Sequence, residues 1–94
     1  MSTEWRHDLP WFQLEMAKKL GAEKNEAKPS YLHEGLGDLL WALDHEVNEL
    51  KRALYGIDSS REEQIAECAD IANFAMMFAA NARREIGREG RVPL

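Results

Sequence analysis

Four acidic residues stand in two pairs of equal spacing, and they are the residues of this sequence best suited to chemistry. Glu46 and Glu49 form the first pair, and Glu67 and Asp70 form the second. Residues three positions apart lie on the same side of an α-helix, so each pair can direct two carboxylates the same way. Carboxylate oxygens are typical ligands of Mg²⁺ and Mn²⁺, whereas Zn²⁺ favours nitrogen and sulfur. The spacing therefore predicts a site for hard divalent cations.

The second acidic pair lies in a segment that is otherwise almost wholly apolar. Between Ile65 and Ala82, 14 of 18 residues are apolar. An ionised carboxylate is costly in such surroundings unless it is paired, protonated or bound to a cation. If the two pairs face each other across a helix contact, their repulsion raises several pKa values, and a divalent cation relieves it. In the alternative, the first pair is solvated on a helix surface and the second forms salt bridges to arginines of a neighbouring subunit.

Three helices are predicted to position the acids, because apolar residues recur with helical spacing and no strand-like alternation occurs. The second helix has the clearest pattern, a face formed by Leu36, Leu39, Leu40, Leu43, Val47, Leu50 and Leu54. We expect one domain over residues 1–94, an all-α helical bundle with a short C-terminal tail. The predicted helices span residues 9–20, 32–55 and 60–86.

Capping residues mark the ends of these predicted helices. Asp8 is placed to cap the first helix, and Gly21 is free to end it in the left-handed conformation. Gly56 supplies the stop of the second helix. Ser60, followed three residues later by Glu63, predicts a capping box at the start of the third.

The composition restricts the classes of partner. The chain has 12 Lys and Arg residues against 17 Asp and Glu residues, for a net charge of −5. This charge disfavours nucleic-acid polymers and anionic membranes, because both attract basic surfaces. A phosphate-bearing ligand would therefore need metal ions. We predict no signal peptide and no membrane span, and the single Cys68 cannot form an internal disulfide, so we expect a cytoplasmic location.

The third predicted helix also indicates how the chain assembles. A helix that is apolar on all sides is normally buried on all sides. A chain of 94 residues has limited surface to bury by itself, so complete burial implies a subunit interface. Trp41 projects away from the leucine face and is a candidate for a subunit contact. We expect a homo-oligomer, either a dimer or a tetramer.

The four acids form the motif Glu46-x-x-Glu49, a gap of 17 residues, and then Glu67-x-x-Asp70. With the surrounding runs EVNELKRAL and AECADIANFAMMFAANAR, this motif resembles the MazG-like all-α nucleoside triphosphate pyrophosphohydrolases, especially small phage-type and bacterial members. The likeness covers about residues 9–84, and the motif is specific because both halves occur together. The resemblance implies a MazG-like fold for the domain and Mg²⁺ ligation by all four acids, with Mn²⁺ as a substitute.

The resemblance also implies an activity, the hydrolysis of a nucleoside triphosphate to a monophosphate and pyrophosphate in nucleotide-pool housecleaning. Glu46 is our candidate for the base that deprotonates the attacking water. The loop pattern Asn25-x-x-Lys28, which some members share, places both residues at the substrate, with Lys28 contacting the triphosphate. Two positions depart from the family: His45 stands where many relatives have Glu, and Tyr31 where similar loops have Trp. These departures bear on which nucleobase the substrate carries, and not on metal binding.

Further residues are candidates for substrate binding. Phe74 lies one turn beyond Asp70 and can stack on a base, or it can belong to the core. Tyr31 and Trp41 can form an aromatic wall for the nucleobase, although Trp41 projects away from the leucine face. Asn73 and Asn81 are unusual in so apolar a helix; we favour substrate binding for Asn73 only, against a buried amide satisfied by a partner chain. The alternative function is a non-catalytic helical oligomer that binds a nucleotide or a protein partner.

Overall fold

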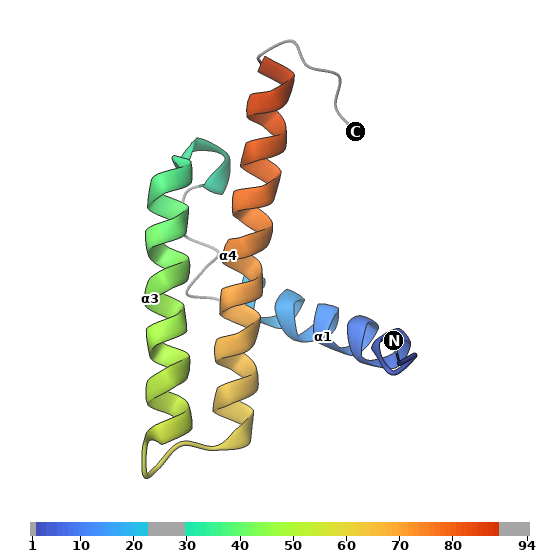
Figure 1. Ribbon diagram of the computed structural model, residues 1–94, viewed down its shortest axis with the longest axis vertical. Helices are drawn as coiled ribbons and strands as arrows, with labels where there is room; N and C mark the ends of the chain where they lie inside the picture. Colours follow the sequence, from blue (N-terminus) through green and yellow to red (C-terminus); the bar gives the residue numbers. More distant parts are fainter. Residues whose placement is uncertain (1, 23–29, 89–94) are drawn as a thin grey trace.

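The computed structural model describes residues 2–22 and 30–88, and these residues form helices connected by turns. No strand occurs in these two ranges, so the predicted all-α class is confirmed. Helices α3 and α4 run side by side in opposite directions, and α1 extends away from one side of α4 (Figure 1). The elements are α1 (Trp5–Leu20), the 3₁₀ turn η1 (Tyr31–His33), α3 (Leu36–Tyr55) and α4 (Arg61–Arg88).

Helix α1 begins at Trp5, four residues before its predicted start. The prediction that Asp8 caps this helix was therefore wrong, because Asp8 lies within its first turn. The carboxylate remains favourable there, since the first turn of a helix carries a partial positive charge. At the other end Gly21 has φ −85° rather than the predicted left-handed conformation, and its N–H bonds to the Ala17 carbonyl at 2.9 Å.

Helix α3 begins at Leu36 rather than at residue 32. The preceding residues Tyr31–His33 form a separate 3₁₀ turn, and the Ser30 hydroxyl accepts a hydrogen bond from its backbone at 3.2 Å. Glu34 and Gly35 then have ψ values of 138° and 154°, which belong to extended backbone and cannot continue a helix. The leucine pattern starts at the first residue after this extended step.

Helix α3 ends at Tyr55, directly before the predicted stop at Gly56. This position requires glycine, because a Cβ there would lie 2.7 Å from the Arg52 carbonyl oxygen. The start of α4 follows the predicted capping box in part, since the Ser60 hydroxyl accepts a hydrogen bond from the Glu63 N–H at 3.1 Å. Although α4 has 28 residues, no helix within residues 2–22 and 30–88 combines the length and apolar character needed to cross a membrane.

Two hydrogen bonds fix the register of the α3–α4 hairpin. The Ser59 hydroxyl and the Gln64 side-chain amide both donate to the carbonyl oxygen of Ala53, the latter at 3.2 Å. This carbonyl belongs to the last turn of α3, where backbone acceptors have no partner inside the helix. The first turn of α4 is thereby held level with the last turn of α3.

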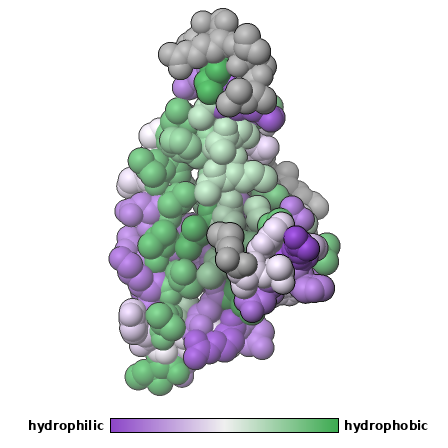
Figure 2. Space-filling model, turned by 45° about the vertical axis from the view of Figure 1, so that its right-hand side comes forward, coloured by the Kyte–Doolittle hydropathy of each residue, from purple (hydrophilic) through white to green (hydrophobic). Residues whose placement is uncertain are grey.

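The fully buried apolar core of the single chain is small. Leu39 of α3 and Ala69 of α4 are the apolar residues that are completely enclosed among those described. Many large apolar side chains remain exposed instead, and apolar surface runs along one face of the molecule in Figure 2. The most exposed of these side chains are Leu14, Leu40, Trp41, Tyr55 and Ile57.

Candidate metal centre

The antiparallel hairpin brings three of the four predicted metal ligands together. Glu46 comes from α3, and Glu67 and Asp70 come from α4; one carboxylate oxygen from each lies within 4.8 Å of the other two. All three side chains are partly buried. We call these three residues the acid cluster. Oxygen donors at this separation are close enough to share one cation of the size of Mg²⁺ or Mn²⁺.

The register of the hairpin explains why these residues meet. Glu46 lies seven residues before Ala53 (53 − 46 = 7), and Glu67 lies eight residues after Ser59 (67 − 59 = 8), whose hydroxyl bonds to the Ala53 carbonyl. Seven or eight residues make about two helical turns, so both acids stand at about the same height above the turn that joins the helices. Asp70 lies about one turn further along the same side of α4.

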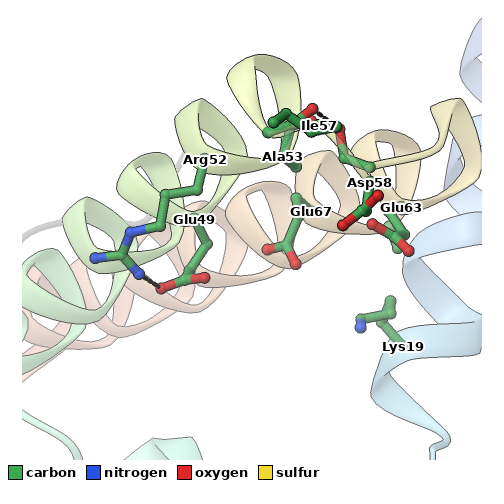
Figure 3. Close-up of a pocket in the computed structure, with 11 residues that line it drawn as sticks. Lys19, Glu49, Arg52, Ala53, Ile57, Asp58, Glu63 and Glu67 are labelled. Carbon is green, nitrogen blue, oxygen red and sulfur yellow. Dashed lines mark hydrogen bonds and ion pairs between the residues drawn. The ribbon is translucent and has the colours of Figure 1, made fainter.

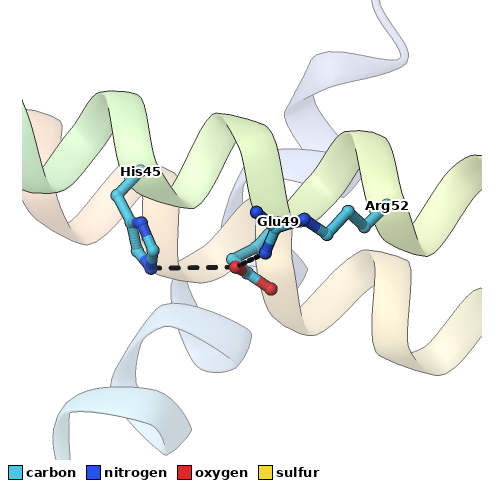
Figure 4. A network of polar contacts seen from close by, with 3 residues as sticks. All are labelled: His45, Glu49 and Arg52. Carbon is cyan, nitrogen blue, oxygen red and sulfur yellow. Dashed lines mark hydrogen bonds and ion pairs between the residues drawn. The ribbon is translucent and has the colours of Figure 1, made fainter.

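Glu49 is not part of the acid cluster in this structure. It lies one turn nearer the α3–α4 connection than Glu46, and its carboxylate faces two cationic or polar side chains of its own helix (Figure 4). Arg52 donates a hydrogen bond to Glu49 Oε1, and His45 Nε2 lies 3.7 Å from the same oxygen. Whether Glu49 ligates a metal therefore stays a prediction.

Glu67 has the most constrained environment of the acid cluster. Burial raises the pKa of its carboxyl, and a hydrogen bond and the charge of Glu46, together with the charge of Asp70, raise it further. The charge of Lys19 acts in the opposite direction. Glu67 Oε2 is buried and receives no hydrogen bond from an N–H or O–H group of the residues that the structure describes. An oxygen of this kind is suited to a cation, because a buried acceptor without a partner is unfavourable.

Lys19 is a member of the site that the sequence did not single out. It comes from the last turn of α1, and its Nζ lies 3.2 Å from Asp70 Oδ2. The two side chains are 23% and 22% exposed, so the ion pair is largely shielded from water. The sequence offers the basic pair Lys18 and Lys19 at the end of α1, but nothing local distinguishes the lysine that faces the acids.

An open groove borders the acid cluster. It encloses about 730 Å³, which is within the range of small-molecule sites. In Figure 3 its charged side chains come from α1, α3, α4 and the turn between α3 and α4, and Lys19 of α1 lies on the same side as Glu67. The charged residues that line it are Lys19, Glu49, Arg52, Asp58, Glu63 and Glu67.

Two predicted substrate residues on α4 lie close to the acid cluster in sequence. Asn73 is buried, and its side-chain amide donates to the carbonyl oxygen of Met16 in α1 at 3.1 Å. Its Oδ1 is buried and has no hydrogen-bond partner in the described part of the chain. Phe74 is partly buried on the same helix. Asn25 and Lys28 lie outside the described residues.

Tyr31 is held at a different level of α4. The side-chain amide of Asn81 donates to the Tyr31 carbonyl at 2.8 Å and to the Glu34 carbonyl at 3.1 Å. The Arg84 guanidinium lies 5.9 Å from the centre of the Tyr31 ring. Asn81 is eleven residues beyond Asp70 (81 − 70 = 11), which corresponds to about 16 Å along the helix. The buried Asn81 is thus satisfied within the chain itself and positions η1.

No protein-family model, curated protein or solved structure matches this chain. What the structure itself defines is an all-helical chain in which three carboxylates from two antiparallel helices converge beside an open groove.

Proposed function

We propose that this chain is a Mg²⁺-dependent nucleoside triphosphate pyrophosphohydrolase of the MazG-like type. The observation that carries the proposal is the convergence of Glu46, Glu67 and Asp70, with one oxygen from each within 4.8 Å of the others. The buried Glu67 Oε2, which lacks a donor among the described residues, supports it. The class of substrate comes from the resemblance of the acidic motif to that family.

The acid cluster would hold Mg²⁺, and Mn²⁺ could replace it. A bound ion of this kind offsets the charge of carboxylates and phosphates and makes water more acidic. The groove needs this added positive charge, because its charged residues are four acids and two cations. These residues cannot by themselves neutralise the charge of a triphosphate. Lys28 and Asn25, which lie outside the described residues, complete the proposed phosphate contacts. Tyr31, Asn73 and Phe74 are the proposed contacts to the nucleoside.

The proposed reaction is an in-line displacement at the α-phosphorus. Glu46 takes one proton from the attacking water at a carboxylate oxygen. The water oxygen forms a bond to the α-phosphorus, and the bond from that phosphorus to the α,β-bridging oxygen breaks. Pyrophosphate leaves with the electron pair of that bond, and the other product is a nucleoside monophosphate.

A product analysis tests this function. Wild-type protein is incubated with Mg²⁺ and each common ribo- and deoxyribonucleoside triphosphate, and pyrophosphate is separated from orthophosphate. We expect a monophosphate and pyrophosphate. Asp70→Asn should lower turnover by more than about 100-fold, because an amide is a poorer ligand for a hard cation. The matched control is Asp44→Asn, which removes an exposed carboxylate from α3 and should keep full activity.

Two outcomes contradict the proposal. In the first, the wild type releases only orthophosphate or nothing from every triphosphate. In the second, Asp70→Asn hydrolyses substrate as fast as the wild type. Failure of all turnover together with retained nucleotide binding would favour the alternative, a non-catalytic helical oligomer.

We also propose that the chain acts as a homo-oligomer, a dimer or a tetramer. The exposed apolar surface supports this assembly, since Leu40 and Trp41 are 56% and 72% exposed and adjacent on α3. On α4, Met76 and Ile86 are also more than a third exposed. Large apolar surface of this kind is typical of subunit interfaces.

A further inference from the structure

Two polar contacts of matched spacing attach helix α1 to α4, the helix that carries two of the three acids of the cluster. The Met16 carbonyl of α1 accepts a hydrogen bond from Asn73 of α4, and Lys19 of α1 forms an ion pair with Asp70 of α4. Lys19 follows Met16 by three residues, and Asp70 precedes Asn73 by three residues. Among the described elements α1 packs on α4 and not on α3. The end of α1 is therefore held beside the acid cluster through Asp70.

Lys19 faces more than one member of the acid cluster. Its Nζ lies 3.2 Å from Asp70 Oδ2. In Figure 3 Lys19 projects from α1 into the groove that Glu67 also lines. In the chain without metal, Lys19 thus supplies positive charge to carboxylates that repel one another.

A divalent cation and this ammonium would need the same carboxylate. A cation shared by the three acids must lie close to Asp70, and Lys19 Nζ already lies 3.2 Å from one of its oxygens. Two positive charges a few ångströms apart repel strongly in a site that is shielded from water. The carboxylate contact that stabilises the metal-free chain therefore opposes metal binding.

We propose that Lys19 is a built-in counter-ion of the acid cluster, which a divalent cation must displace from Asp70 in order to bind. This inference rests on the proposed metal site. A different role for Lys19 would be contact with a substrate phosphate. In that role, replacing Lys19 would leave the metal affinity unchanged when no nucleotide is present. The counter-ion role instead predicts opposite effects of removing Lys19 on metal-free stability and on metal affinity.

Titration of the protein with Mn²⁺ in the absence of nucleotide tests the displacement. Lys19→Met keeps the length of the side chain and removes its charge. We expect its dissociation constant for Mn²⁺ to fall by about three- to tenfold and its melting temperature without metal to fall. Lys19→Arg, which restores the positive charge, should return both values toward those of the wild type.

Lys18→Met is the matched control. Lys18 is the neighbouring lysine on α1, but it is 71% exposed and pairs with Glu15 of its own helix at 3.0 Å. Its removal should change neither the Mn²⁺ affinity nor the Mn²⁺-dependent change in melting temperature.

A labelling measurement on the wild type keeps the test independent of variant folding. An amine-reactive reagent should modify Lys19 several-fold faster when Mn²⁺ is bound, and Lys18 at an unchanged rate, as followed by mass spectrometry. If the wild type binds no divalent cation, both the proposed metal site and the proposed role of Lys19 are wrong. If it binds Mn²⁺ but neither Lys19→Met nor the labelling rate responds, the metal site stands and the role of Lys19 is wrong.

Discussion

At the scale of single residues, Glu67 connects protonation, stability and the proposed metal. Its pKa is raised above the value of 4.5 for a free side chain, so the folded chain holds this proton more tightly than the unfolded chain does. Below pH 4.5 both states are protonated. As the pH rises through the folded-state pKa the proton is lost, and the stability that it gave to the metal-free fold is lost with it.

The variant Glu67→Gln separates these effects. Without metal at about pH 8 its melting temperature should exceed that of the wild type, because it carries no buried charge. At about pH 4 the two proteins should differ little. Added Mg²⁺ should raise the melting temperature of the wild type more than that of the variant, since a ligand that binds only the folded state stabilises it.

The control for this experiment is Glu62→Gln, an exposed acid in the first turn of the same helix. It should respond to Mg²⁺ as the wild type does. An equal response of Glu67→Gln and the wild type would mean that the cluster acts through salt bridges and not through a cation.

At the scale of elements, Asn81 joins η1 to α4. Its amide nitrogen donates to two backbone carbonyls of the segment before α3, and its oxygen accepts from Arg84 at 2.7 Å. Asn81 is only 6% exposed, so its amide would be an unsatisfied buried group without these hydrogen bonds, and such a group is costly. The place of the Tyr31 ring beside α4 depends on this residue.

We expect Asn81→Ala to lower the free energy of unfolding by about 1–3 kcal/mol, because two backbone carbonyls lose the donor that the buried Asn81 supplies. Chemical denaturation measures this change, and hydrogen exchange should show faster exchange at Tyr31–His33. Asn48→Ala, which truncates an exposed amide on α3, should change stability far less. A similar small change in both variants would contradict a structural role for Asn81.

At the scale of the whole molecule, many large apolar side chains are exposed and few apolar residues are completely buried. Leu39 is the largest completely buried side chain of the described residues, whereas Trp41 and Leu14 are 72% and 64% exposed. Small domains have little core to offset the entropy lost on folding, so a second copy of the chain is a natural source of further burial. The acid cluster would then depend on assembly for its stability.

Sedimentation at micromolar concentration should detect a dimer or tetramer. Trp41→Ala should weaken this assembly by about 30-fold or more, because exposed aromatic residues often dominate interface energies. Lys51→Ala, which removes an exposed polar side chain of α3, should leave it unchanged. A folded monomer of the wild type at that concentration would refute the predicted oligomer.

The sequence by itself determined the helices, because their signals are local. Leucines at helical spacing, the Ser60 cap and the stop at Gly56 act within one or two turns of the chain. The start of α3 was missed because residues 31–33 can form either a 3₁₀ turn or α-helix, and the contacts of Asn81 with this segment come from α4.

The composition of the site was decided by tertiary structure. Both acidic pairs have the same local spacing, so only the hairpin register, tied at Ala53, brings Glu46 to the level of Glu67. Glu49 instead pairs with Arg52, three residues away on its own helix. Lys19 is 51 residues from Asp70 (70 − 19 = 51), and its part in the site depends on where α1 crosses α4. Sequence spacing fixes which face of a helix a side chain occupies, whereas packing between helices decides what it meets there.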